Sequence, residues 1–318
     1  ISSSKHSPSS KVIFMGTPDF AVPALAGLLA GGYDVAAVVT QPDRPSGRGR
    51  QLEPSPVKRF ALHQALPVLQ PATLRAPEAV AELAALQPGV IVVAAFGQIL
   101  RPAVLALPPY GCINVHASLL PRWRGAAPVP AAILAGDQVT GSTIMRMDEG
   151  MDSGPILAQA ALLIQADDTG GRLTDRLARQ GADLLAETLP RWLAGAVAPQ
   201  PQDPALATVC RPLRKDQGAI DWSRPAGEIS RAVRAYNPWP AATTTWNGSP
   251  LKILEAKALA GPSLPEPAGA VRQHQGAVVV NTGDGLLQLD VVQLAGRKAT
   301  ATDAFIRGQR GFVGSCLG

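Results

Sequence analysis

An apolar run and a helix start adjoin each other in Lys11-Val12-Ile13-Phe14-Met15-Gly16-Thr17-Pro18. A short apolar run that ends in Gly is typical of a buried strand. Thr and Pro are favoured at the N-cap and at the first helical position, so we predict that Thr17 and Pro18 begin a helix that runs to about residue 29. A buried strand that leads directly into a helix indicates the first unit of a parallel α/β sheet.

The alternation of strand and helix patterns continues along the chain. Apolar runs predict further strands at about residues 34–40, 90–95 and 142–147, and periodic patterns predict helices at about residues 77–86 and 173–193. This alternation predicts an α/β fold with a Rossmann-like, mostly parallel sheet. In such a sheet, ligands bind at the carboxyl ends of the strands.

The pattern changes near residue 195. Residues 195–204 are rich in proline, which is typical of a linker. A helix at about residues 226–236 follows, and then short strand patterns separated by turns predict a small β-barrel. These strand patterns lie at about residues 242–246, 251–256, 276–281 and 286–294. The predicted parts are a disordered extension or cloning remnant at 1–10, an α/β domain at 11–194, a linker at 195–209 and a β-barrel domain at 210–318.

A strand with polar side chains on one face lies at Gly111-Cys112-Ile113-Asn114-Val115-His116. Side chains alternate across a strand, so Ile113 and Val115 can face the core while Asn114 and His116 share the opposite face. An Asn amide can donate to a carbonyl oxygen, and a His can donate or accept a proton. Acyl transfer through an oxyanion requires both functions. The alternative is that the pair only satisfies neighbouring backbone groups.

Two carboxylates follow in the turn-rich segment Met147-Asp148-Glu149-Gly150-Met151-Asp152-Ser153-Gly154-Pro155. If the two strands are near neighbours, a carboxylate on this loop can approach His116, because functional residues concentrate on loops at strand ends. Asp is also favoured beside Gly in turns, so Asp148 and Asp152 can each be turn residues instead.

Three strings of this chain together resemble the folate-dependent formyltransferases. They are Asn114-x-His116-x-Ser118-Leu119-Leu120-Pro121, Met151-Asp152-Ser153-Gly154-Pro155 and Phe14-Met15-Gly16-Thr17-Pro18-Asp19-Phe20. Within the family, the closest resemblance is to the members that formylate methionyl initiator tRNA. It is carried by the basic loop at residues 40–50, by Arg122-Trp123-Arg124-Gly125-Ala126-Ala127-Pro128, and by Ile220-Asp221-Trp222 and Ala235-Tyr236-Asn237-Pro238-Trp239-Pro240 in the long C-terminal part.

The resemblance implies a formyltransferase fold followed by an OB-like barrel that binds tRNA. It also implies a donor, 10-formyltetrahydrofolate, and an acceptor, the α-amino group of methionyl initiator tRNA in translation initiation. Oxyanion stabilisation is assigned to Asn114 and His116, and the resemblance selects Asp152 as the carboxylate that orients His116 and assists proton removal. The residues implied for the folate donor are Phe96, Gly97, Gln98, Ile99, Leu100, Ser118, Leu119, Leu120, Pro121 and Asp148. Those implied for tRNA are Arg44, Gly47, Arg48 and Arg50.

Composition agrees with this class. The chain has 318 residues, 46% of them hydrophobic, which is ample for a soluble globular core, and its longest apolar stretch is too short to span a membrane. Cys112, Cys210 and Cys316 are too widely spaced for a disulfide framework or a zinc site, so we predict a reducing cytoplasm. Cys112 shares the face of Asn114, where it is a reactive thiol or a small buried residue.

Charge and motifs narrow the set of partners. Basic residues exceed acidic ones by 13 to 9 in residues 201–318 and by only 16 to 15 in residues 1–200. The excess in the C-terminal part suits contact with a polyanion. The alternative is an ordinary basic surface. The chain lacks a Gly-x-Gly-x-x-Gly or Walker motif, and its four histidines are isolated, so we predict no nicotinamide cofactor and no metal. Neither a membrane nor an obligate protein partner is implied.

Three rival functions stay open. A sugar-nucleotide formyltransferase or a purine-pathway transformylase with the same donor would keep Asn114, His116 and Asp152 but would not need the loop around Arg48. A tRNA-binding protein with a decayed site would not turn over the donor. Residues 209–216 depart from the family pattern, which leaves the tRNA contacts of that segment open.

Overall fold

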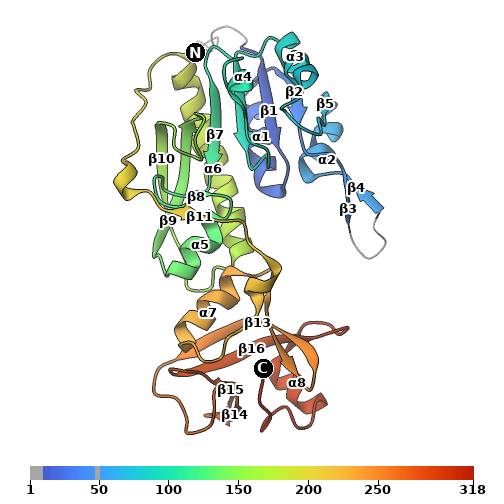
Figure 1. Ribbon diagram of the computed structural model, residues 1–318, viewed down its shortest axis with the longest axis vertical. Coiled ribbons are helices and arrows are strands. Elements are labelled where there is room, and N and C mark those ends of the chain that lie inside the picture. The colour runs from blue at the N-terminus through green and yellow to red at the C-terminus, as the bar shows by residue number, and fades with distance from the viewer. Residues whose placement is uncertain (1–9, 47–50) are drawn as a thin grey trace, which may run out of the picture. The chain divides into compact units, whose positions relative to one another are not determined.

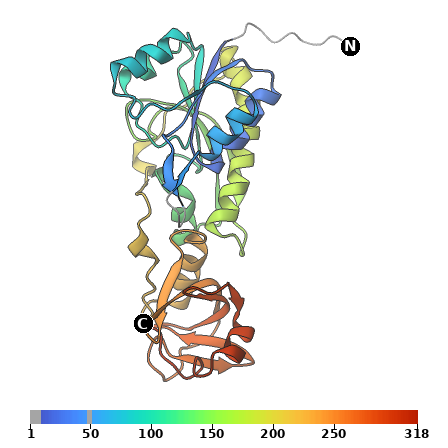
Figure 2. The same ribbon diagram turned by 90° about the vertical axis from the view of Figure 1, so that its right-hand side faces the viewer.

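The computed structural model describes residues 10–46 and 51–318, which pack as two compact units (Figures 1 and 2). The first unit takes in the described residues up to 125 together with residues 139–163 and 174–209. The second takes in residues 126–138, 164–173 and 210–318. This packing does not test the predicted domain boundaries at residues 194 and 210, which stay a prediction.

The first unit is built on a seven-stranded sheet with the strand order β10-β9-β7-β6-β1-β2-β5. The strands are β1 (Val12–Gly16), β2 (Val35–Val39), β5 (Val68–Leu69), β6 (Val90–Ala94), β7 (Cys112–His116), β9 (Val139–Arg146) and β10 (Ile156–Leu163). Neighbouring strands from β7 to β5 pair in parallel, whereas β9 runs antiparallel to both β7 and β10. The predicted mostly parallel α/β sheet is confirmed.

Helices lie on both sides of this sheet (Figure 2), and strand alternation divides the apolar core of the unit into two layers, one on each face. Val12 and Phe14 of β1 face the layer that contains apolar side chains of α1, α2 and α6. Ile13 and Met15 face the layer that contains side chains of α3 and α4. Both faces of β1 are fully buried, as helices on both sides of a parallel sheet require. The helices are α1 (Val22–Ala30), α2 (Pro56–His63), α3 (Pro77–Ala85), α4 (Pro102–Leu105) and α6 (Gly170–Leu193).

The start of the first helix differs from the prediction. A 3-10 turn, η1 (Asp19–Ala21), precedes α1, and neither element has a side-chain cap. Thr17 Oγ1 instead donates to the carbonyl oxygen of Phe96 at 2.8 Å and accepts from the backbone N–H of Gln41 at 3.3 Å. The prediction of Thr17 as an N-cap is therefore wrong, because its hydroxyl joins the segments that follow β1, β2 and β6.

Several short elements of the first unit were not predicted from patterns. β3 (Arg44–Ser46) pairs antiparallel with β4 (Gln51–Glu53) between β2 and α2. Three of the residues implied for tRNA, Gly47, Arg48 and Arg50, lie outside the described residues. The remaining short elements are β8 (Arg124–Gly125), η2 (Pro204–Leu206) and β11 (Val209–Cys210), whose last residue belongs to the second unit.

The second unit contains an antiparallel sheet with the strand order β12-β13-β16-β15-β14, and β17 pairs with β16. Its strands are β12 (Ala242–Trp246), β13 (Ser249–Leu259), β14 (Val271–His274), β15 (Ala277–Asn281), β16 (Leu286–Leu294) and β17 (Thr300–Ala301). Its helices are α5 (Pro128–Ala135), η3 (Lys215–Gly218), α7 (Ala226–Ala235) and α8 (Thr302–Gly308). The predicted helix and short strands of this region all recur in the structure.

The C-terminal segment joins the two ends of this sheet. Leu317 N donates to Gly269 O at 2.9 Å, next to β14, and Gly318 N donates to Thr245 O of β12 at 3.2 Å. The strands therefore close into a barrel-like ring around one apolar core. None of the described helices has the length and apolar character needed to cross a bilayer.

Candidate active site

Asn114 and His116 lie on one face of β7, between β6 and β9. The alternate residues Ile113 and Val115 face the core layer that contains α6, as the alternation of side chains predicts. Asn114 is 8% exposed and His116 is 6% exposed, so both polar side chains are buried and need partners. Those partners come from loops outside the strand.

The carboxylate of Asp152 reaches both side chains from the loop between β9 and β10. Asn114 Nδ2 donates to Asp152 Oδ1 at 3.3 Å, and His116 Nδ1 lies 3.6 Å from Asp152 Oδ2. The backbone N–H of Gly125 donates to the same Oδ2 atom at 2.8 Å. The structure thus brings the three residues assigned to catalysis into one group around one carboxylate.

His116 is oriented by a backbone group that sequence patterns did not reveal. Its Nε2 atom lies 2.9 Å from the carbonyl oxygen of Trp123. A carbonyl oxygen only accepts, so Nε2 carries a hydrogen and donates it. The other ring nitrogen, Nδ1, therefore faces Asp152, where it can accept a proton or, in the imidazolium, donate one.

The loop that holds Trp123 is itself anchored to the sheet. Ser118 Oγ donates to Arg122 O at 2.6 Å, and Thr143 Oγ1 donates to Ser118 O at 2.6 Å. Leu120 N donates to Thr143 Oγ1 at 3.1 Å, and Leu120 O accepts from Gln159 Nε2 at 2.8 Å. Residues 118–121, which were predicted to shape the donor pocket, thus fix the backbone that orients His116.

Asp148, the other carboxylate of the loop, stays apart from the group around Asp152. It is exposed, and its Oδ1 atom accepts from Gly150 N at 3.0 Å and from Ser153 Oγ at 2.8 Å. The bond from Gly150 N closes an Asx turn and the bond from Ser153 Oγ spans the loop, so the carboxylate stabilises the shape of the loop. Its predicted contact with the folate donor stays a prediction.

The segment predicted to hold the pterin ring, residues 96–100, follows β6. Phe96 and Leu100 are buried, whereas Ile99 is 71% exposed. Gln98 Oε1 accepts from Leu74 N at 2.9 Å and its Nε2 donates to Pro71 O at 3.2 Å, which fixes the segment. Within the described part of the chain, the backbone N–H and C=O groups of residues 97–100 make no hydrogen bond, so they are available to a ligand.

A hollow of about 680 Å³ lies where β1, β2 and β6 end. Its lining includes Arg44, implied for tRNA, together with Phe96 and Gly97, implied for the donor. Arg44 is exposed, and its guanidinium donates to Gln41 Oε1 at 3.3 Å. The hollow thus brings together residues that the sequence analysis assigned to two different substrates.

Cys112 is a structural residue. Burial raises the pKa of its thiol to about 12, and the nearby positive charge of Arg146 offsets this only in part. The thiol is 1% exposed and lies 3.9 Å from Val104 O. Because the thiolate is the reactive form, this environment favours the small buried residue over the reactive thiol.

In the described ranges 10–46 and 51–318, no three His, Cys, Asp or Glu side chains converge in the way that a metal site requires.

Comparison with known proteins gives the same family over both units. The formyl transferase family model matches residues 10–189, and the model of the formyl transferase C-terminal domain matches residues 212–310. A protein of Chloroflexus aurantiacus named methionyl-tRNA formyltransferase is 51% identical, over 94% of this chain and 96% of its own length. One of Roseiflexus castenholzii with the same name is 50% identical, over 98% of this chain and 99% of its own length.

Solved structures with the same fold are more distant in sequence. The sugar 3N-formyl transferase WlaRD has a TM-score of 0.65 at 18% identity, over 92% of this chain and 100% of that chain. HypX from Aquifex aeolicus, in complex with tetrahydrofolic acid, has a TM-score of 0.64 at 14% identity, over 96% of this chain and 48% of that chain. Similarity at this level establishes the fold alone. From the two family models and the relatives near 50% identity, we conclude that the chain belongs to the formyl transferase family, among the methionyl-tRNA formyltransferases.

Proposed function

We propose that this protein transfers the formyl group of 10-formyltetrahydrofolate to the α-amino group of methionyl initiator tRNA, in the cytoplasm, for translation initiation. The observation that carries the proposal is that the Asp152 carboxylate lies within 3.6 Å of both Asn114 and His116, two polar side chains on one buried strand face. Relatives of that name, about 51% identical over nearly the whole chain, support the choice of acceptor.

The three side chains divide the chemistry between them. Asn114 Nδ2–H donates to the formyl oxygen as that oxygen becomes negative during attack by the amine. His116 as the imidazolium, with Nε2–H held on Trp123 O, directs its Nδ1–H toward the same oxygen and Asp152. The Asp152 carboxylate takes the proton that the amine loses when the new C–N bond forms. That proton then passes to the departing nitrogen as the old C–N bond breaks.

The fit of a folate donor is supported by the backbone after β6. The edge of a pterin ring carries several hydrogen-bond donors and acceptors, and residues 97–100 offer unused N–H and C=O groups beside buried Phe96 and Leu100. When bound, 10-formyltetrahydrofolate supplies an activated formyl group. The protein supplies the groups that hold the ring, stabilise the oxyanion and move the proton.

An acceptor assay tests the proposal. Purified protein is given 10-formyltetrahydrofolate with charged initiator methionyl-tRNA or with an amino-sugar nucleotide, and formylated product is quantified for each. We expect kcat/KM for the charged tRNA to exceed that for the sugar nucleotide by about three orders of magnitude or more, as expected for a site built around one acceptor. Uncharged initiator tRNA is the matched control, because it lacks the α-amino group. Faster formylation of the sugar nucleotide would overturn the choice of acceptor in favour of a sugar-nucleotide formyltransferase.

The basic loop after β2 is proposed to contact the RNA. Arg44 lies on β3, and Gly47, Arg48 and Arg50, outside the described residues, follow it in sequence. Arginine suits contact with phosphates and bases, because its planar guanidinium offers several donors. The excess of basic residues after residue 200 supports a second contact with the polyanion through the C-terminal part.

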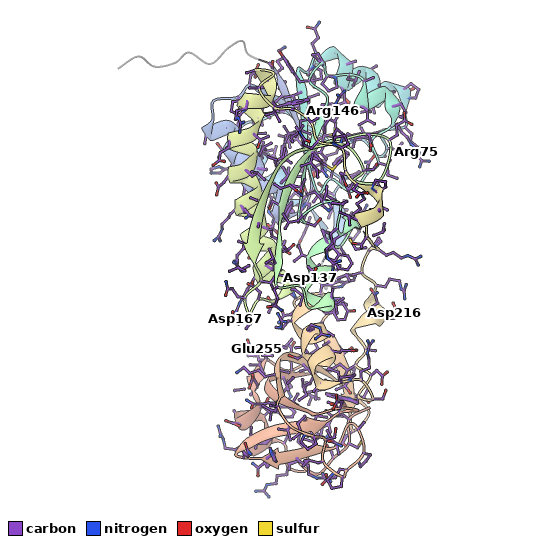
Figure 3. All side chains as sticks on the ribbon, turned by 90° about the vertical axis from the view of Figure 1, so that its left-hand side faces the viewer. Arg75, Asp137, Arg146, Asp167, Asp216 and Glu255 are labelled. Atoms are coloured by element: carbon purple, nitrogen blue, oxygen red, sulfur yellow. The ribbon has the colours of Figure 1, made fainter. Side chains whose placement is uncertain are left out.

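The Arg48→Ala variant tests the role of the loop. We expect kcat/KM for charged tRNA to fall by about tenfold or more, while the Kd for the folate donor changes less than about twofold. The slope of log affinity for tRNA against log salt should become shallower by about one unit. Arg75→Ala, at an exposed arginine labelled in Figure 3, removes the same charge elsewhere and is the control. Equal losses for donor and tRNA would show that the loop is structural.

A further inference from the structure

Gln202 makes a set of hydrogen bonds at the candidate site that its sequence context did not predict. It lies in the proline-rich segment predicted as a linker, yet its side chain is half-buried. Its Nε2 atom donates to the carbonyl oxygen of Asp152 at 2.8 Å and to that of Gly154 at 2.7 Å. A primary amide has two N–H donors, so these two bonds use both of them.

The backbone at Asp152 requires such support. Its φ of 50° lies in the left-handed region, which aspartate tolerates better than most residues but occupies less readily than the helical or extended regions. Gly154 passes so close to the end of β9 that a Cβ atom on it would lie 2.0 Å from the carbonyl oxygen of Arg146, a residue labelled in Figure 3. The segment from 152 to 154 therefore combines a left-handed residue with a close approach that only glycine allows, and one amide binds it at both ends.

The same side chain also reaches the loop on the other side of the group. Gln202 Oε1 accepts from Arg124 Nε at 3.0 Å and from Arg124 Nη2 at 2.8 Å. Arg124 lies between Trp123, whose carbonyl oxygen accepts from His116, and Gly125, whose N–H donates to Asp152 Oδ2. One glutamine thus joins the loop that carries Asp152 to the loop that orients His116.

We infer that Gln202 is a positioning residue for formyl transfer, which keeps the Asp152 carboxylate in register with Asn114 and His116. The inference rests on the proposed function, because it assigns Gln202 a role only through Asp152. Contacts that hold a reacting group in place change rates, because a small displacement of that group raises the activation barrier. Gln202 contacts the backbone carbonyl oxygen of Asp152, and not its carboxylate.

Three variants separate the bonds of this side chain. Gln202→Leu removes all of these hydrogen bonds and keeps a side chain of similar size. Gln202→Glu keeps the acceptor for Arg124 but loses both donors to the Asp152 loop. Gln200→Leu is the matched control, because Gln200 lies two residues away and, within the described part of the chain, its side chain donates only to Ala198 O at 3.3 Å. The assay is formylation of charged initiator tRNA with 10-formyltetrahydrofolate by the full chain.

We expect both Gln202 variants to lower kcat by about 10- to 100-fold. KM for donor and tRNA should stay within about threefold, because Gln202 is proposed to act through Asp152 and not on either substrate. Gln200→Leu should retain the parent kcat. Gln202→Glu with the parent kcat would overturn the inference, since the donors to the loop would then be dispensable. So would a Gln202→Leu variant that behaves like the control.

A double-mutant cycle separates positioning from a general structural role. In a chain that already carries Asp152→Asn, Gln202→Leu should lower kcat by less than about threefold, because the charge that it positions is gone. The same fold-loss in both backgrounds would indicate a structural role and overturn the inference. If Asp152→Asn alone leaves kcat unchanged, the proposed catalytic role of Asp152 fails, and that result is distinct from the failure of Gln202.

Discussion

Replacing Asp152 by asparagine is expected to lower kcat for formyl transfer by about two to three orders of magnitude. The carboxylate contacts Asn114, His116 and the backbone N–H of Gly125, so its negative charge acts on each of these groups. Asparagine is nearly isosteric and, like aspartate, tolerates a positive φ, so the loop should keep its course. The loss should therefore come from the missing charge and proton acceptor. Single-turnover kinetics with saturating charged tRNA and donor measure it.

Two controls distinguish the loss of the catalytic carboxylate from a general effect of charge or stability. Asp167→Asn changes an exposed aspartate that pairs with Arg172, and it should leave kcat within about twofold of the parent. Thermal unfolding of Asp152→Asn should lie close to that of the parent chain. A loss of kcat below about threefold in Asp152→Asn would remove Asp152 from the mechanism.

His116→Ala should lower kcat by about two orders of magnitude or more, with donor binding largely kept. The imidazole supplies the donor directed at the developing negative charge, and such a contact acts mainly in the transition state. His116→Gln is the sharper variant, because its amide can still donate to Trp123 O and so preserve the loop, but it cannot carry the positive charge. Both variants should lose turnover to a similar degree, as measured with saturating donor.

His63→Ala is the control for this pair, since His63 is exposed and, among the described residues, its ring hydrogen-bonds only to the neighbouring Gln64. Combining His116→Ala with Asp152→Asn should cost little more than the larger single loss, because residues that act as one unit are not additive. Fully additive losses would mean that the two side chains act in separate steps. Full activity of His116→Gln would show that orientation of the loop, and not the imidazole, matters.

Side chains of the site were predictable to the extent that they lie on a regular strand. The period of two places Asn114 and His116 on one face of β7, and the structure finds them there with Ile113 and Val115 on the other. Asp152 could be selected over Asp148 only through family resemblance, because both stand two residues before a Gly in one turn-rich loop. Only the folded loop shows that Asp148 closes an Asx turn while Asp152 reaches Asn114.

The partners that orient these side chains were not predictable from patterns. Two of them are backbone groups, the Trp123 carbonyl and the Gly125 N–H, and a backbone group is present at every position, so residue type does not mark it. The role of Gln202 could not be predicted, because it lies in a proline-rich segment and such a composition is typical of linkers whether or not they pack against the protein. Thr17 shows the same limit of sequence patterns at a helix start. Its residue type suits an N-cap, but its hydroxyl instead hydrogen-bonds to Phe96 O and Gln41 N in the segments after β6 and β2.

The path of the chain between the two units limits how modules of this protein can be recombined. The chain crosses from one unit to the other after residues 125, 138, 163, 173 and 209. The second unit therefore includes two segments that precede residue 210, 126–138 and 164–173. Within that unit, Arg231 Nε donates to Leu134 O at 3.0 Å, and Arg234 Nη1 donates to Asp168 O at 3.0 Å. A chimera that exchanges only the residues after 209 would present α5 and the 164–173 segment to a foreign α7. Exchange of the second unit for that of another protein therefore has to carry all three segments together.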